Sequence, residues 1–240
     1  MMAPRRARGR ARLAVLASGG GSNLQALLDH LCARGAARAA DVVVVVSDRA
    51  GAGALERARA SGVAAEVVPP RQIGALLEEQ RIDLVALAGY LRFIPDEVTA
   101  RFRGRMVNVH PSLLPAFGGE GMYGARVHEA VIAAGVSITG ATVHFVDTEY
   151  DAGPIIAQWP VPVLEGDSAA TLGARVLRVE HALFPRIVDA IAGGRVALNE
   201  AGRVEPRPFG AGHSAFAIAD TPETSLVADL AGLFDRSRAV

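Results

Sequence analysis

The segment that most constrains the fold of this chain is residues 42–46, an unbroken run of five valines. β-branched side chains favour extended backbone, and a strand with one face in water would alternate apolar with polar residues. A run without polar interruption is typical of a strand that is buried on both faces. Such strands occur in parallel sheets whose two faces are covered by helices, so the run predicts an α/β fold.

Short apolar runs alternate with helix-like segments along the first half of the chain. Leu24, Leu27 and Leu31 recur at helical spacing directly after the first apolar run. Predicted strands cover residues 13–17, 42–46, 64–68, 84–88 and 105–109, and predicted helices cover residues 23–34, 52–61 and 73–80. This alternation predicts an open, mostly parallel, twisted sheet with helices on both faces and right-handed crossovers.

The second half of the chain departs from that alternation. Residues 139–146 and 155–163 both alternate like strands, so mixed strand directions are expected at this end of the sheet. Helices are predicted at residues 128–134, 169–192 and 221–236, the second of them long and amphipathic. We expect a flexible basic N-terminal arm (1–11), a main domain that carries the chemistry (12–204) and a C-terminal extension without an assigned role (205–240).

Charge and cysteine content narrow the class of partner. Lys+Arg and Asp+Glu both number 25, whereas a nucleic-acid-binding protein usually has a basic excess. No apolar run approaches the ~18 residues that a membrane helix needs. We therefore expect small-molecule partners, no nucleic acid and no membrane. The single cysteine, Cys32, allows no intramolecular disulfide, which fits a reducing compartment, and a cytoplasmic location is expected.

The N-terminus has some features of a signal peptide. Five arginines lie within the first 12 residues and precede the apolar residues 13–17. That apolar run is too short for the core of a signal peptide, and it passes directly into glycines. A basic arm before the first buried strand is the preferred interpretation.

Residues 108–115, Asn-Val-His-Pro-Ser-Leu-Leu-Pro, are the most informative motif. Alternation along a strand puts Asn108 and His110 on one face, and Pro111 ends the strand. Open α/β sheets place their chemistry at such strand ends. An amide donor beside an imidazole can stabilise a developing oxyanion and move a proton. The alternative is a turn with one polar cap and one hydrogen-bonded histidine.

Residues 18–23, Ser-Gly-Gly-Gly-Ser-Asn, lie between the first strand and the first helix. Glycines let the backbone approach an anion, and the helix start supplies free N–H groups and a positive dipole end. Leu24 stands where the dinucleotide pattern has its last glycine, and no lysine follows as in a P-loop. The turn predicts a phosphate site. The alternative is a tight turn capped by Ser22.

Two residues near the 139–163 strands are further candidates. Asp151 lies in the loop between these strands, where its carboxylate can reach His110 and hold it as an imidazolium. An ordinary Asx turn is the alternative. His144 is either part of the site or a hydrogen-bonded core residue. The candidate ligands do not have a recognised metal-ligand spacing, so no metal is expected. These residues are His110, His144, Asp147 and Asp151.

Glu180 and Arg92 have a functional and a structural interpretation each. Glu180, on the long predicted helix, can bind sugar hydroxyls or be a solvated helix charge. Arg92, at the end of the fourth strand, can bind a carboxylate or line the surface.

Taken together, residues 17–26, 87–92, 108–115 and 142–154 resemble the folate-dependent formyltransferase family. The Asn-x-His-Pro-Ser-Leu-Leu-Pro motif is shared by the wider family. The Gly-Ser-Asn-Leu-Gln stretch narrows the resemblance to the phosphoribosylglycinamide formyltransferases and a hydrolytic relative. The similarity covers about residues 12–200 and implies a Rossmann-like formyltransferase fold.

The resemblance implies transfer of the formyl group of 10-formyltetrahydrofolate to the amine of 5-phosphoribosylglycinamide (glycinamide ribonucleotide) in de novo purine (IMP) biosynthesis. The implied catalytic residues are Asn108, His110 and Asp151. The implied phosphate and ribose ligands are Gly21, Ser22, Asn23 and Glu180. The folate would lie among Leu87, Leu91, Arg92, Phe93, Ile94, Val98, Met106 and Asn108. His144 and Ser112 would support the site from behind.

The mechanism that the resemblance implies needs neither a metal nor a nucleophilic side chain. Asn108 and a protonated His110 donate to the formyl oxygen, while Asp151 keeps His110 charged and helps the proton reach the leaving nitrogen. The folate is a co-substrate, and the protein is expected to be a monomer or homodimer.

Three features depart from the family pattern, and two rival functions stay open. The helix after Val68 is short, residues 118–124 form a glycine-rich lid with unassigned contacts, and the segment after residue 205 has no counterpart.

A formyltetrahydrofolate deformylase would use the same triad with water as acceptor. It usually carries an N-terminal regulatory domain, whereas about eleven residues precede the first strand here. A non-catalytic nucleotide-binding module would leave Asn108, His110 and Asp151 unexplained.

Overall fold

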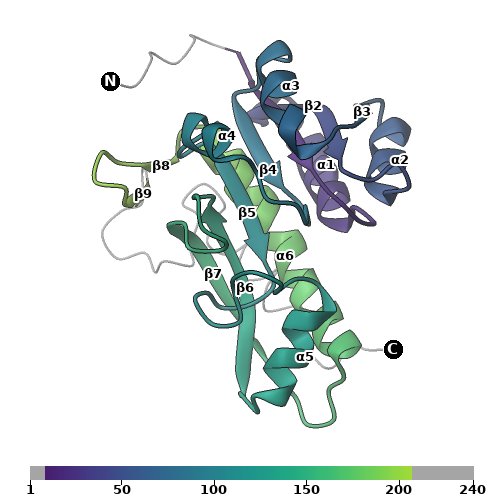
Figure 1. The fold of residues 1–240 in the computed structure, drawn as a ribbon, viewed down its shortest axis with the longest axis vertical. Helices are drawn as coiled ribbons and strands as arrows, with labels where there is room; N and C mark the ends of the chain where they lie inside the picture. The colour runs from purple at the N-terminus through teal and green to yellow at the C-terminus, as the bar shows by residue number, and fades with distance from the viewer. Residues whose placement is uncertain (1–8, 207–240) are drawn as a thin grey trace.

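The computed structural model describes residues 9–206 and is built around a seven-stranded sheet in the order β3-β2-β1-β4-β5-β6-β7 (Figure 1). Strands β1 to β5 run parallel to one another, β6 is antiparallel to β5, and β7 is antiparallel to β6. The strands are β1 (Ala11–Leu16), β2 (Ala40–Ser47), β3 (Ala64–Val67), β4 (Leu84–Leu87), β5 (Met106–His110), β6 (Ile138–Phe145) and β7 (Ile155–Pro162). The expected open, mostly parallel sheet with mixed C-terminal strands is confirmed.

Helices cover both faces of this sheet. One face packs against α1, α2 and the second half of α6, and the other against α3 and α4. A third cluster joins α5 and the first half of α6 to β6 and β7. The helices are α1 (Ser22–Arg34), α2 (Gly53–Ala60), α3 (Ile73–Glu79), α4 (Asp96–Arg101), α5 (Ala125–Ala133) and α6 (Ala169–Ala192), with 3-10 turns at Gly35–Ala37 and Pro70–Gln72.

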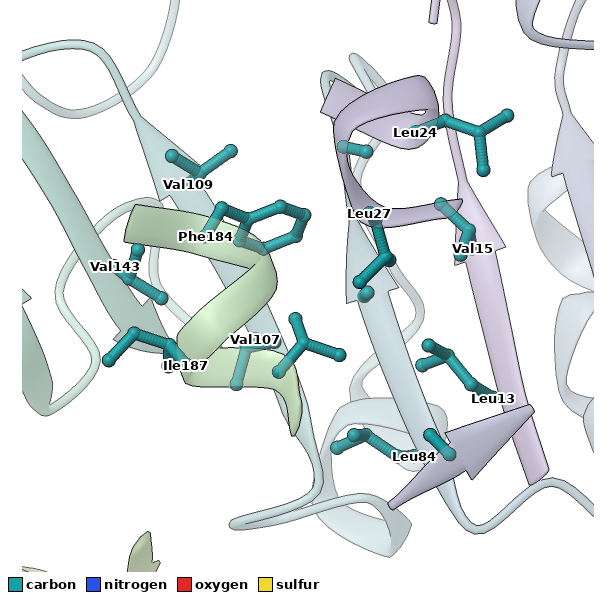
Figure 2. Close-up of a cluster of buried hydrophobic side chains, with 14 of the residues drawn as sticks. Leu13, Val15, Leu24, Leu27, Leu84, Val107, Val109, Val143, Phe184 and Ile187 are labelled. Carbon is teal, nitrogen blue, oxygen red and sulfur yellow. The ribbon is translucent and has the colours of Figure 1, made fainter. Parts of the chain in front are cut away.

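Strand alternation divides the core between the two faces. In β1, Leu13 and Val15 point into the cluster under α1 and α6, whereas Ala14 and Leu16 face α3 and α4. Figure 2 shows the first cluster, in which Phe184 of α6 lies among leucines and valines of the strands and of α1. Each such side chain contributes roughly 1.5–3 kcal/mol on burial, so this cluster is what fixes α6 against α1.

The long helix α6 covers the residues that periodicity predicts. It begins with a capping box in which Ser168 accepts from the Thr171 N–H and the Thr171 hydroxyl accepts from the Ser168 N–H. α5 begins at Ala125, three residues before its expected start.

One helix and one two-stranded hairpin are absent from the sequence prediction. The short helix α4 begins after Pro95, with Asp96 and Glu97 in its first turn, where negative charge is favoured. β8 (Val196–Leu198) and β9 (Val204–Pro206) form an antiparallel hairpin. The expected domain boundary between residues 204 and 205 falls inside β9. The helix predicted at residues 221–236 lies outside the described residues.

The packing of α1 on α6 sets the position of the candidate site. Both helices cover the same face of the sheet, so the start of α1 meets the middle of α6 beside the carboxyl ends of β1 and β4 (Figure 1). In residues 9–206 no helix has the length and apolar character to cross a membrane.

Candidate active site

A cavity of about 690 Å³ opens at the carboxyl ends of β4 and β5. Its walls come from residues 89–94 after β4, from the end of β5, from residues 119–126, from residues 146–151 and from α6. Asn108, His110 and Asp151 all line it, as do His144 and Glu180. The fold therefore brings together candidate residues from both halves of the chain.

The antiparallel pairing of β5 and β6 places Asn108 directly opposite His144. The Asn108 Nδ2 atom lies 3.2 Å from His144 Nε2 and donates to Asp151 Oδ1 at 3.4 Å. His144 Nδ1 donates to the carbonyl of Phe145 at 2.8 Å, because a carbonyl oxygen only accepts. The Nε2 atom of His144 then faces both the Asn108 amide and the Asp151 carboxylate, so three polar groups meet at this point.

His110 is 3% exposed and has oxygen atoms beside both ring nitrogens. Nε2 donates to the carbonyl of Phe117 at 2.9 Å, and Nδ1 lies 3.4 Å from Asp151 Oδ2. Burial lowers the pKa of His110 below its usual value and outweighs the opposing effects of Asp151 and the Phe117 carbonyl. The direction of this shift opposes the expectation that Asp151 holds His110 protonated. Removal of water destabilises the imidazolium by more than the single carboxylate at 3.4 Å stabilises it.

Asp151 is held in place by its own loop. Its φ of 55° lies in the left-handed region, which is uncommon for a residue other than glycine, and its Oδ2 accepts from the Gly119 N–H at 3.0 Å. A Cβ at Gly153 would lie 1.8 Å from the Phe145 carbonyl oxygen, so the loop can return to β7 only with glycine there. Burial acts to raise the pKa of Asp151, but contacts with His144, His110 and Gly119 N–H lower it overall, and the group is a carboxylate at neutral pH.

Glu180 and Asn23 form a second polar group on the opposite wall. The Asn23 amide donates to Glu180 Oε2 at 2.6 Å, and both residues line the cavity. Burial raises the pKa of Glu180 to about 7, against the opposing effect of the Asn23 hydrogen bond. Asn23 Oδ1 is buried and has no hydrogen-bond partner in residues 9–206. A ligand with hydroxyl groups would satisfy it.

The glycine turn before α1 does not have the cap that its sequence allows. Gly21 is the N-cap residue with φ 75°, and no side chain caps the helix, so the alternative in which Ser22 caps it is not observed. The N–H groups of the first turn are left without side-chain partners at this end. Of the three predicted phosphate ligands, Asn23 lines the cavity, whereas Gly21 and Ser22 do not.

Six of the eight predicted folate residues line the cavity, and two do not. The six are Leu87, Leu91, Arg92, Phe93, Ile94 and Asn108. Met106 shares a strand face with Asn108 but lies deeper in the sheet, where α4 covers it and leaves it fully buried. Val98 is on α4 and packs against α3. A Cβ added to Gly74 of α3 would lie 3.0 Å from the Val98 Cγ2 atom, which shows how close the two helices are. Neither the Met106 nor the Val98 side chain lines the cavity in this structure.

Neighbouring groups fix the positions of two other predicted residues. Arg92, which lines the cavity, donates to Asp48 Oδ2 at 3.1 Å. Ser112 is fully buried, and its hydroxyl donates to the Ala116 carbonyl while its own carbonyl accepts from Thr142 at 2.6 Å. Ser112 thereby holds the turn that follows Pro111.

The cavity also includes residues that the sequence did not single out. The rings of Phe93 and Tyr150 meet edge to face, with centroids 5.3 Å apart, and join the two loops at the mouth. His128 of α5 is buried in the wall, and its Nδ1 has no partner in the described part of the chain. The sequence offered one signal for these additional residues, which was the position of Tyr150 next to Asp151. Among residues 9–206 no cluster of three or more His, Cys, Asp or Glu side chains has the arrangement of a metal site.

Comparison with known proteins gives consistent matches. A family model described as formyl transferase matches residues 11–188. The chloroplastic phosphoribosylglycinamide formyltransferase of Vigna unguiculata is 41% identical over 203 residues, which are 80% of this chain and 64% of that protein. The trifunctional purine biosynthetic protein adenosine-3 of Bos taurus is 42% identical over 205 residues, 81% of this chain and 20% of that protein. The chain thus spans less than two thirds of the length of either relative.

Solved structures show the same similarity. Glycinamide ribonucleotide transformylase 1 from Symbiobacterium toebii has a TM-score of 0.75 and 41% identity, covering 82% of this chain and 94% of its own. A formyltetrahydrofolate deformylase from Pseudomonas syringae pv. tomato has a TM-score of 0.73 but 25% identity, covering 82% of this chain and 65% of its own. The two structures are alike in fold, and the higher identity favours the transformylase as the nearer relative.

Proposed function

The chain belongs to the formyl transferase family, and on that premise we propose that it transfers the formyl group of 10-formyltetrahydrofolate to the amine of 5-phosphoribosylglycinamide in purine biosynthesis. The observation that carries this proposal is the convergence of Asn108, His110 and Asp151 on one cavity wall. Residues 12–204 would form the catalytic domain.

In the proposed reaction the glycinamide amine attacks the formyl carbon, and negative charge develops on the formyl oxygen. The Asn108 amide and the His110 Nε2–H are the proposed donors for that oxygen; the single Nε2–H donates to the Phe117 carbonyl at 2.9 Å here, so it must leave that carbonyl to reach the formyl oxygen. Nε2 carries a proton even when the ring is neutral, because it donates to the Phe117 carbonyl in the structure. The lowered pKa of His110 therefore does not remove this donor. Loss of one such donor typically costs about 10²- to 10³-fold in rate.

The same group of residues accounts for the proton transfer. The attacking amine must lose a proton, and the leaving nitrogen must gain one before its bond to the formyl carbon breaks. Asp151, a carboxylate beside both histidines, is the proposed acceptor, either directly or through water. Each histidine can then pass the proton to the leaving nitrogen of the folate as charge builds up on that nitrogen.

The ribonucleotide is proposed to lie between the start of α1 and the middle of α6. Gly21, Ser22 and Asn23 would bind the phosphate, since the uncapped helix start offers free N–H groups. Glu180 would accept from the ribose hydroxyls, and Asn23 Oδ1 is a further acceptor there. This arrangement aims the amine toward His110.

The folate is proposed to occupy the other end of the cavity. Leu87, Leu91, Phe93 and Ile94 form its apolar wall, and residues 148–153 would close over it. The donor would then present its formyl group to Asn108. We place the enzyme in the cytoplasm as a monomer or homodimer, with these two small molecules as its partners.

The test is acceptor dependence. The purified protein is incubated with 10-formyltetrahydrofolate, with and without 5-phosphoribosylglycinamide, and tetrahydrofolate release is followed by absorbance. Release only with the acceptor, together with formylated ribonucleotide detected by mass spectrometry, supports the proposal. Equal release without the acceptor would identify a deformylase instead, the activity named for one of the structural relatives.

A further inference from the structure

Arg57 of α2 contacts the glycine turn from outside the cavity. Its Nε atom donates to the carbonyl oxygen of Gly20 at 2.8 Å, and its Nη1 atom donates to Gln25 Oε1 at 3.2 Å. Gln25 lies in the first turn of α1, where its N–H donates to the Gly21 carbonyl. The Arg57 guanidinium therefore joins Gly20, in the glycine turn, to Gln25 of helix α1.

The start of α2 holds the same turn through its backbone. The Ala54 N–H donates to the Gly19 carbonyl at 3.1 Å. A Cβ at Gly21 would lie 2.7 Å from Ala54 Cα, so the turn rests directly on α2. Two successive carbonyls, those of Gly19 and Gly20, are thus hydrogen-bonded to α2. A carbonyl oxygen that faced a bound anion would repel it, so this tether favours anion binding at the start of α1.

The Arg57 guanidinium makes no direct ion pair within the described residues, although Asp29 accepts from Gln25, which Arg57 also contacts. The side chain is exposed, and in residues 9–206 it makes no ion pair with a carboxylate. Its positive charge nevertheless extends to α6, where it contributes, after burial, to lowering the pKa of His181 next to Glu180. The Arg57 charge therefore lies beside the glycine turn that precedes α1, near which the phosphate is proposed to bind.

We propose that Arg57 is a positioning residue for the phosphate monoester of the substrate. It keeps the Gly20 carbonyl turned away from the anion and adds a positive charge beside the turn. The inference rests on the proposed function for the identity of the substrate, and it extends the site to a helix that contributes no residue to the cavity wall.

Steady-state kinetics with Arg57→Ala and Arg57→Lys test the inference, with Arg59→Ala as the matched control. Arg59 lies on the same helix, is exposed and makes no side-chain hydrogen bond or ion pair in the described region. Arg57→Ala should raise KM for the ribonucleotide about 10- to 30-fold, the usual effect of losing a hydrogen bond to a charged group. kcat and KM for the formyl donor should stay within about twofold. Arg57→Lys keeps the charge and should restore part of the loss, and Arg59→Ala should match the wild type.

A binding measurement separates this inference from the proposed function. Inorganic phosphate is titrated into the wild-type protein and each variant by NMR, with the N–H signals of Gly21, Ser22 and Asn23 as reporters. Weaker phosphate binding in Arg57→Ala but not in Arg59→Ala supports the inference even if the enzyme assay shows another reaction. Equal weakening in both variants, or no change in either phosphate affinity or ribonucleotide KM, overturns it. If Arg57→Ala does not fold, the same comparison is made with Arg57→Gln.

Discussion

The side chains of Asn23 and Glu180 share a hydrogen bond of 2.6 Å although 157 positions separate them in the chain. Asn23 is at the start of α1 and Glu180 is in the middle of α6, so the bond depends on the packing of one helix on the other. Because Glu180 is 6% exposed and its pKa is about 7, it carries a proton through much of the acidic range. The pair therefore links the protonation of the site to the stability of the fold.

The first prediction concerns Glu180→Gln. The folded pKa of about 7 lies above the ordinary value of 4.5, so the stability that Glu180 contributes is fully present below about pH 4.5 and is lost as the pH rises through 7. Glutamine cannot ionise, so the variant should match the wild type near pH 4 and exceed it above pH 8, by up to about 3 kcal/mol. Urea unfolding at both pH values measures the difference. The exposed Glu129→Gln is the control, and an equal effect of Glu180→Gln at both pH values would contradict the assignment.

The second prediction concerns Asp151→Asn. Asparagine keeps the size of the side chain but removes the proton acceptor beside His110 and His144. Turnover should fall about 10²- to 10⁴-fold, the range of general acid–base catalysis. KM for the ribonucleotide should change less than about threefold, because Asp151 lies away from Asn23 and Glu180. Proportional losses in turnover and binding would show that Asp151 has only a structural role.

The third prediction follows the protonation of His110. Burial lowers its pKa, and Asp151 opposes that effect. NMR titration of the ring should therefore give a midpoint below 6.5 in the wild type. The midpoint should be lower still in Asp151→Asn, since the variant has lost the charge that raises it. A midpoint above 6.5 in the wild type would restore the imidazolium that the sequence led us to expect.

The fourth prediction concerns the ring pair at the mouth of the cavity. Phe93 and Tyr150 join two loops through one edge-to-face contact, which is worth about 0.5–1.5 kcal/mol beyond the buried area. Tyr150→Ala should raise KM for the formyl donor about three- to tenfold and leave KM for the ribonucleotide unchanged. Tyr150→Phe keeps the ring and should behave like the wild type. If the phenylalanine variant loses as much as the alanine variant, the hydroxyl rather than the ring pair is responsible.

The fifth prediction concerns Gly153→Ala. The added Cβ would lie 1.8 Å from the Phe145 carbonyl oxygen, so the loop that carries Asp151 must move. We expect a loss of about 1–3 kcal/mol of stability, together with a strong loss of turnover. Gly51→Ala meets nothing within 4 Å and serves as the control. Thermal unfolding and a turnover assay check both variants, and a stable, active Gly153→Ala protein would show that the loop tolerates the change.

Local patterns in the sequence predicted most of the fold. The valine run of β2 and the leucine spacing of α1 each depend on neighbours a few residues away, and the ends of α6 coincide with the limits of its apolar stripe. α4 was missed because a six-residue helix is too short to show a period. Met106 and Val98 were assigned to the folate pocket without knowledge of that helix, which covers one of them and contains the other.

The residues of the candidate site could be predicted from the sequence, but the direction of the His110 pKa shift could not. The positions of Asn108 and His110 follow from strand alternation, and Asp151 follows from its loop. The pairing of Asn108 with His144 depends on the register between β5 and β6, for which the sequence has no local signal. The neutral state of His110 depends on how completely the assembled cavity excludes water, a property of the whole fold.

The packing of α6 across α1 has a consequence for synthesis of the protein on the ribosome. Strands β1 to β4 and helix α1 are complete once about 87 residues have been made, but Phe184 and Ile187 follow almost a hundred residues later. Until then Leu24 and Leu27 lack the helix that shields them from water. A nascent chain paused before residue 180 would therefore expose an apolar surface and have only Asn23 of the Asn23–Glu180 pair.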